Sequence, residues 1–134
     1  MDKQLTDDSI LKPGEAAPSE ILVIEADEDL GVMLSFALEQ ETHQRVLLAR
    51  DGDEAMHLLE VHAPRLVLVD ADLPGMQDLS LYDQLCTQQG CVEIPTLVIG
   101  SELAESVVGQ RKLIQLGSFF NLWELFTLVL QLVS

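Results

Sequence analysis

Carboxylate side chains follow two short apolar runs of the sequence at the point where each run ends. Glu25 and Asp27 follow the first run, and Asp70 and Asp72 follow the second. If both runs are strands of one parallel sheet, these carboxylates meet at one edge, where their mutual repulsion favours a hard cation such as Mg²⁺. A carboxylate beside a bound metal can act as a nucleophile toward a phosphoryl group. The pattern therefore points to a site for a divalent cation at this edge, where a carboxylate could also react with a phosphoryl group.

The first acidic cluster also has a structural interpretation. Residues 27–29 are Asp-Glu-Asp, and acidic residues are favoured at the N-terminus of a helix, where they cap free N–H groups and meet the positive end of the helix dipole. Asp70 is different, because it directly follows the most apolar run and precedes Asp-Leu-Pro-Gly, a turn sequence. We favour helix capping for residues 27–29 and a functional role for Asp70.

Short apolar runs alternate along the chain with segments of helical period. The runs predict strands at 21–24, 45–49, 66–69, 95–99 and 112–116, and the periodic segments predict helices at 27–40, 53–62, 78–89, 102–109 and 122–133. This alternation is typical of an α/β three-layer sandwich, with a five-stranded parallel sheet covered by helices on both faces. The polar first residues, 1–19, predict a flexible leader, and residues 20–134 predict one domain.

The charge of the chain excludes several classes of partner. Seven basic residues against 23 acidic ones give a net charge of −16, which repels nucleic acid and anionic membranes. The chain has no apolar run long enough to cross a bilayer and no signal-peptide pattern at its start. We expect a soluble cytoplasmic protein whose partners are proteins. Cys86 and Cys91 are interpreted as reduced thiols, and the histidine spacing argues against zinc.

Four segments, in order, resemble the receiver domains of two-component response regulators (CheY-like) over residues 20–133. They read ILVIEADEDL, LLARDGDEAMHLLEVHAPRLVLVDADLPGM, CVEIPTLVIG and FFNLWEL. The resemblance implies a flavodoxin-like fold with strand order 2-1-3-4-5 and a phosphoacceptor at Asp70. It also implies a Mg²⁺ site formed by Glu25, Asp70 and the backbone carbonyl of Asp72. The implied partner is a histidine kinase or another signalling protein.

The sequence departs from the family pattern at three positions. Ala26 replaces the second acidic residue, a direct metal ligand, and Gly100 replaces the Ser or Thr that contacts the phosphoryl group. Ser118 replaces the lysine after the fifth strand. Asp27 and Ser101 are the neighbouring residues that could substitute for the first two losses. The resemblance is therefore to a degenerate receiver, or pseudo-receiver, in which Mg²⁺ binding is expected to be weak.

The last helix is apolar almost all round. Trp123, Leu128 and Leu130 lie outside the stripe expected to face the sheet, so they form either an exposed protein interface or a surface covered by neighbouring segments. Receivers commonly pair through the face that contains this helix, so a homodimer there is one expectation. The residues of the stripe are Leu122, Leu125, Phe126, Val129 and Leu132.

Three functional hypotheses follow. The first is a receiver-like signalling module that acts through protein interaction, with weak or no phosphorylation switching. The second is a working phosphoacceptor in which Glu25, Asp27 and Ser101 complete the site. The third, a small hydrolase that uses the acidic edge, ranks last because the sequence offers no convincing general base. We therefore expect no enzyme activity.

Overall fold

The strands and helices alternate in the computed structural model, which describes residues 19–88 and 94–133. The strands are β1 (Glu20–Ile24), β2 (Arg45–Ala49), β3 (Leu66–Asp70), β4 (Thr96–Ile99) and β5 (Leu113–Leu116). The helices are α1 (Glu28–Thr42), α2 (Gly52–Leu59), α3 (Ser80–Gln88), α4 (Glu105–Val108) and α5 (Leu122–Val133). The predicted leader and Cys91 lie outside the described residues, apart from Ser19.

All five strands form one parallel sheet in the order β2-β1-β3-β4-β5, which confirms the predicted topology. The central strands β1, β3 and β4 are buried on both faces, as expected of the continuous Val, Ile and Leu runs that form them. In register, Ile24 pairs with Val69, and Asp70 pairs with Ile99. The carboxyl ends of these three strands therefore meet at one edge, where Glu25 and Asp70 lie.

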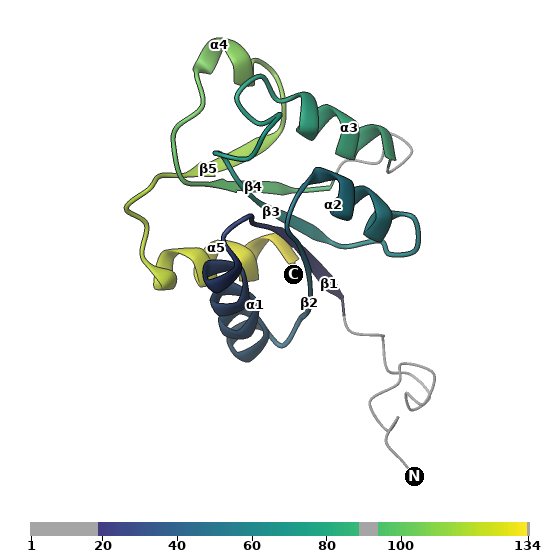
Figure 1. Cartoon of the computed structure of the whole chain (residues 1–134). Coiled ribbons are helices and arrows are strands. Elements are labelled where there is room, and N and C mark those ends of the chain that lie inside the picture. Colours follow the sequence, from purple (N-terminus) through teal and green to yellow (C-terminus); the bar gives the residue numbers. More distant parts are fainter. Residues whose placement is uncertain (1–18, 89–93, 134) are drawn as a thin grey trace.

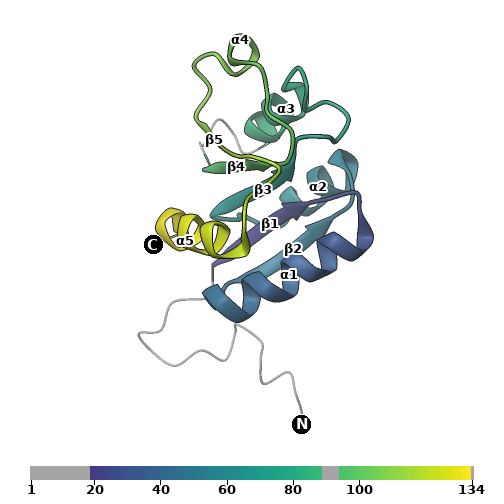
Figure 2. The ribbon, with the colours of Figure 1, turned by 90° about the vertical axis from the view of Figure 1, so that its left-hand side faces the viewer.

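Helices cover both faces of the sheet. Figures 1 and 2 show α1 and α5 on one face and α2 and α3 on the other. Leu34 of α1 and Leu125 of α5 share one buried cluster, whereas Leu59 of α2 and Leu85 of α3 belong to a second cluster on the opposite face. Two separate cores on one sheet confirm the predicted three-layer sandwich. None of the described helices combines the length and apolar character that a membrane span requires.

Helix α1 begins at the acidic cluster. Asp27 is its N-cap residue, and its side chain accepts a hydrogen bond from the N–H of Leu30 at 3.0 Å. Glu28 and Asp29 occupy the first turn, where their charge meets the positive end of the helix dipole. The helix ends at Thr42, and its C-cap residue His43 has a φ of 57°, in the left-handed region. The capping interpretation of residues 27–29 is therefore confirmed.

Helix α2 ends at Leu59 and not at the predicted residue 62, and two further differences from the sequence-based prediction concern α4 and α5. Helix α4 was expected over 102–109 but spans only Glu105–Val108, because Leu103 turns into the core before the helix begins. In α5 the expected stripe is partly wrong: Leu122 is exposed, whereas Val133 is buried. Leu128, expected outside the stripe, is half-buried against the core shared by α1 and α5. The helix therefore presents a slightly rotated face to the sheet.

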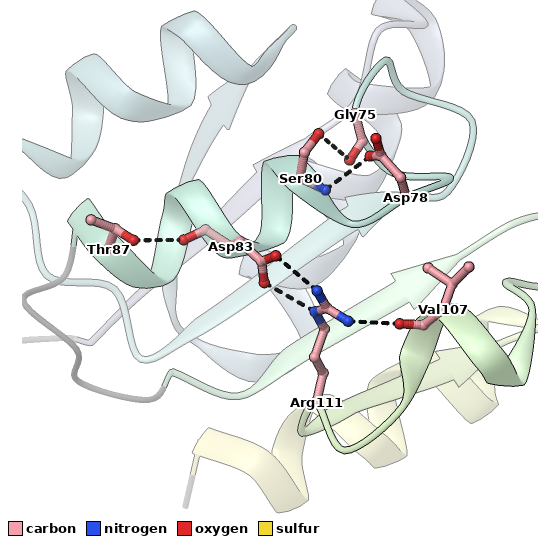
Figure 3. Close-up of polar contacts among 7 residues, drawn as sticks. All are labelled: Gly75, Asp78, Ser80, Asp83, Thr87, Val107 and Arg111. Atoms are coloured by element: carbon pink, nitrogen blue, oxygen red, sulfur yellow. Dashed lines mark hydrogen bonds and ion pairs between the residues drawn. The ribbon is translucent and has the colours of Figure 1, made fainter.

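A single arginine joins the short helix α4 to helix α3 (Figure 3). The guanidinium of Arg111 donates to both carboxylate oxygens of Asp83, at 3.0 and 2.8 Å. It also donates to the backbone carbonyl of Val107 at 2.7 Å. This ion pair lowers the pKa of the Asp83 carboxyl. The forked contact thus fixes the end of α4 to helix α3 on the same face of the sheet, which the four residues of α4 could not do alone.

Candidate functional site

Glu25 is a buried carboxylic acid at the carboxyl edge of the sheet. Only 2% of its surface is exposed, and its backbone N–H donates a hydrogen bond to the backbone carbonyl of Ala49 at 2.9 Å. Oε2 accepts from the N–H of Asp27 at 3.2 Å, while Oε1 is buried without a hydrogen-bond partner. Burial, together with the adjacent Asp70 carboxyl, raises the pKa of Glu25 to about 7. Glu25 is therefore held next to Asp70 at a cost in solvation.

Asp70 is the last residue of β3 and is only half-buried, so its carboxylate reaches the surface of this edge. Oδ1 accepts from the N–H of Asp72 at 2.8 Å. The N–H of the next residue, Ala71, donates to Ile99 of β4 at 2.8 Å, which anchors the strand end. The turn that follows requires Gly75, whose φ of 89° favours glycine. The structure thus brings Glu25 and Asp70 together and places Asp72 in the adjoining turn.

The two residues that follow Glu25 contribute less to this edge. Ala26 is exposed and offers a methyl group, which cannot bind a metal. The Oδ1 atom of Asp27 is already engaged in capping α1. Within residues 19–88 and 94–133, no group of three or more His, Cys, Asp or Glu side chains is arranged to hold a metal ion. The unpartnered Oε1 of Glu25 and the carboxylate of Asp70 remain as donors suited to a hard cation.

Gly100 directly follows β4 and lies beside Asp70. Its N–H donates to Leu116 of β5 at 3.2 Å, and its φ is 102°, a conformation that side chains rarely adopt. A Cβ atom at this position would lie 3.2 Å from Oδ1 of Asp70. The backbone therefore has a local conformation suited to glycine at the position where the family pattern has a hydroxyl. Ser101 is exposed in the loop that follows.

Ser118 is an exposed residue of the loop between β5 and α5, and it lines a cavity of about 480 Å³. Sequence reasoning did not find this cavity. Two adjacent phenylalanines, Phe119 and Phe120, and two acidic residues, Glu102 and Glu124, form much of its wall. The signal that was available is the Phe-Phe pair in a loop, where large apolar residues are unusual. The other lining residues are Leu116 and Gly117.

Helix α5 and strand β5 are the elements next to this cavity. On α5, Trp123 and Leu130 are exposed, but Leu128, which the sequence also placed outside the stripe, packs partly against the core. Gln115 of β5 accepts a hydrogen bond from the N–H of Leu103 at 2.8 Å. An amide side chain thereby ties the loop after β4 to the edge strand.

Comparison with known proteins identifies the family. The model of the response regulator receiver domain matches residues 21–118. A curated relative, the alkaline phosphatase synthesis transcriptional regulatory protein PhoP of Bacillus subtilis, is 30% identical over 89 residues, which is 66% of this chain. The chain spans only 37% of that relative's length.

Two solved structures of receiver domains share this fold. The non-phosphorylated HemR receiver domain from Leptospira biflexa matches with a TM-score of 0.69 and 26% identity, covering 87% of this chain and 94% of that one. The receiver domain of the sensor histidine kinase PA1611 from Pseudomonas aeruginosa matches with a TM-score of 0.64 and 22% identity, covering 87% and 98%. That structure has a magnesium ion coordinated in its active site cleft.

Proposed function

This chain belongs to the response regulator receiver domain family of two-component signal transduction, and we propose that it is an atypical receiver that acts through protein contacts with little phosphorylation switching. The observation that carries the proposal is the set of residues that surrounds Asp70 at the carboxyl edge of the sheet. Its acceptor carboxylate is in place, but Ala26 supplies no second ligand and Gly100 no hydroxyl. Ser118 supplies no positive charge. The site therefore keeps its nucleophile and lacks the groups that assist it.

Phosphoryl transfer depends almost entirely on positioning and on neutralising charge. A bound Mg²⁺ would supply that neutralisation, and Glu25, Asp70 and the backbone carbonyl of Asp72 are the groups that would hold it. The two carboxylates fit a divalent cation, since burial leaves Oε1 of Glu25 without a partner. Because only two side-chain ligands are available, we expect weaker binding than in a site with a third carboxylate.

The loss of the hydroxyl at position 100 affects the response as well as the reaction. A phosphoryl group on Asp70 would find no hydroxyl donor on Gly100, where a Cβ atom would lie 3.2 Å from Oδ1 of Asp70. Gln115 already holds the loop after β4 through Leu103, so this loop is fixed without phosphate. These contacts support an output that is set by the folded surface and changes little on phosphorylation.

A second candidate function is a working phosphoacceptor at Asp70 with a non-standard Mg²⁺ site. The specific observation in its favour is the buried, unpartnered Oε1 of Glu25 next to Asp70, which is a cost that a bound cation would remove. Asp27 is less available as a Mg²⁺ ligand in this second candidate function than expected, because its side chain caps α1. Ser101 would have to supply the hydroxyl from the exposed loop.

The test uses Mg²⁺ and acetyl phosphate, a small phosphoryl donor, with intact-protein mass spectrometry as the readout. We expect no stable phosphoryl adduct on the wild-type chain. Asp70→Asn gives the background, and Glu41→Gln, which changes an exposed acidic residue far from the site in α1, is the matched control. Stoichiometric labelling of wild type that disappears in Asp70→Asn would establish the second candidate instead. A labelling-competent receiver run in parallel shows that the donor is active.

The remaining parts of the proposal concern partners and setting. We infer a cytoplasmic signalling protein without enzyme activity, whose partner is a histidine kinase or another signalling protein. The exposed side chains of Trp123 and Leu130 support an interaction surface on α5, to which Leu128 contributes little. A homodimer through this helix stays a prediction, and sedimentation equilibrium measures it directly.

A further inference from the structure

The cavity beside Ser118 lies between two loops at the carboxyl edge of the sheet. One loop leaves β4 toward α4, the other joins β5 to α5, and Figure 1 shows both at the same end of the sheet. The N–H of Gly100 donates to Leu116, so the starts of the two loops are joined. Glu102 comes from the first loop, whereas Phe119, Phe120 and Glu124 come from the second loop and the start of α5. The cavity of about 480 Å³ is thus formed by segments that are distant in sequence.

The walls of the cavity combine negative charge with aromatic surface. Glu102 and Glu124 bring carboxylates, and no residue that lines the cavity is basic. Oε1 of Glu124 accepts from the N–H of Asn121 at 3.1 Å, which holds this carboxylate in position at the start of α5. The side chain of Phe119 is 100% exposed, so its ring is available for contact. A planar cation can form an ion pair with the carboxylates and stack on the aromatic ring at the same time.

The start of α5, which supplies Glu124 to the cavity, carries further exposed apolar side chains. Trp123 is 74% exposed and Leu122 is 38% exposed, and both follow Phe119 closely in sequence. Exposed Trp and Phe side chains on one short segment are typical of a protein contact surface, where aromatic and Arg residues provide most of the binding energy. These side chains therefore point to a protein partner that extends beyond the cavity itself.

We propose that this cavity binds an arginine side chain on a basic segment of a protein partner. The guanidinium would stack on Phe119 and pair with the carboxylates of Glu102 and Glu124, and the flanking partner residues would cover Trp123. The net charge of −16 attracts such a segment over a longer range. This inference deepens the proposed function and rests on it, because it names the chemistry of the partner that an interaction-based receiver would contact.

Other occupants fit the walls less well. An anionic ligand would be repelled by both carboxylates, and a purely apolar side chain would remove them from water without a partner. A second copy of this chain would bring another net charge of −16 toward the same surface. A lysine would carry the charge, but it lacks the planar fork that can pair with a carboxylate while it stacks on a ring.

Trp123 is the single tryptophan of the chain and reports on the start of α5 by its fluorescence. The probe is a short capped peptide that carries two arginines, titrated into the full chain with calorimetry as a second readout. Matched peptides replace both arginines by citrulline, which keeps the shape without the charge, or by lysine. We expect saturable binding of the arginine peptide, weaker binding of the lysine peptide and none of the citrulline peptide.

Two variants locate the binding. Glu102→Gln and Phe119→Ala should each raise the Kd roughly two- to fivefold, as expected for loss of one exposed ion pair or one cation–π contact. Glu41→Gln and Phe36→Ala are the matched controls, because both change exposed residues of α1, and they should leave the Kd unchanged. All four positions are exposed, so the variants should fold, and urea unfolding checks this.

Several outcomes would overturn the proposal. Equal binding of the citrulline peptide would remove the charge requirement, and equal weakening by the α1 controls would show a general charge or surface effect. No binding at millimolar peptide would also overturn it. A wild-type dimer in sedimentation equilibrium that Phe119→Ala dissociates would assign the surface to a second copy. None of these results bears on the labelling test at Asp70, so failure here is distinguishable from failure of the proposed function.

Discussion

The side-chain oxygen of Gln115 accepts a hydrogen bond from the backbone N–H of Leu103 at 2.8 Å, across the gap between the edge strand and the loop after β4. Leu103 is buried, so its N–H depends on a protein partner. We expect Gln115→Ala to lower the free energy of unfolding by about 0.5–1.5 kcal/mol. Urea unfolding measures this, and amide hydrogen exchange at Leu103 should become faster. Gln115→Glu keeps an acceptor oxygen and should retain most of the protection; equal exchange in both variants would contradict the assignment.

The raised pKa of Glu25 makes stability depend on pH. Its ordinary value is 4.5 and its folded value is about 7, so the folded chain binds this proton more tightly than the unfolded chain. Stability should therefore fall as pH rises from about 4.5 to about 7 and become level above that range. We expect Glu25→Gln to remove this slope and to raise the free energy of unfolding by about 1–2 kcal/mol near pH 8. Urea unfolding in EDTA across pH measures it, with Glu41→Gln as the control that should keep the slope.

The conformation of Gly100 predicts a penalty for any side chain there. Both its φ of 102° and the 3.2 Å approach of a Cβ atom to Oδ1 of Asp70 oppose substitution. We expect Gly100→Ala to cost about 1–3 kcal/mol of stability in urea unfolding. Gly117 is the matched control, since a Cβ atom there meets nothing within 4 Å. Comparable losses at the two glycines would show that the strain inferred at Gly100 is absent.

A carboxylate restored at position 26 should strengthen Mg²⁺ binding. Ala26 is exposed next to Glu25, so an Asp side chain has room there and adds a ligand of the kind that Mg²⁺ prefers. We expect Ala26→Asp to lower the Kd for Mg²⁺ at least roughly tenfold, the scale of a gain of about 1.4 kcal/mol. Isothermal calorimetry measures this, and Ala26→Asn separates charge from shape. An unchanged Kd would show that position 26 does not face the site.

The Arg111 contact predicts local protection of α4. Arg111→Lys keeps the charge but cannot form the two-point contact with Asp83 and also reach the carbonyl of Val107. We expect faster amide exchange in 105–108 with little change in the rest of the sheet. Arg50→Lys is the control, because Arg50 makes only a 3.8 Å ion pair with Glu28. Uniformly faster exchange across the sheet would instead indicate a general loss of stability.

The sequence was sufficient for the fold because its signals are local and repeated. Buried strands appear as continuous apolar runs, and the acidic cluster at 27–29 marks the start of α1. The prediction failed at α4, where Ala104 makes no side-chain cap and Leu103 is held in the core by Gln115. The hydrogen bond between Leu103 and Gln115 joins two segments of the chain, and the hydrophobic period of either segment does not reveal such a contact. The rotation of α5, which exposes Leu122 and half-buries Leu128, depends on packing against α1 in the same way.

The candidate site was predictable only in part. Asp70 and Glu25 follow from their positions after strands, and the structure brings them together. The positive φ of Gly100 was not predictable, because a glycine in a sequence does not reveal which conformation it adopts. The cavity lined by Glu102 and Phe119 was missed because it joins two loops, and loops carry no period from which to infer proximity.

The backbone at Gly100 also bears on how this receiver could change over generations. A single substitution to Thr would restore the hydroxyl of the family pattern, but it would meet a φ of 102° and the carboxylate of Asp70. Recovery of that hydroxyl would therefore first require the loop after β4 to adopt another conformation, and the Gln115 contact opposes such a change. Each intermediate would lose stability before it gained any activity. A single substitution at position 100 is therefore not enough to give this edge a hydroxyl without a change in the surrounding backbone.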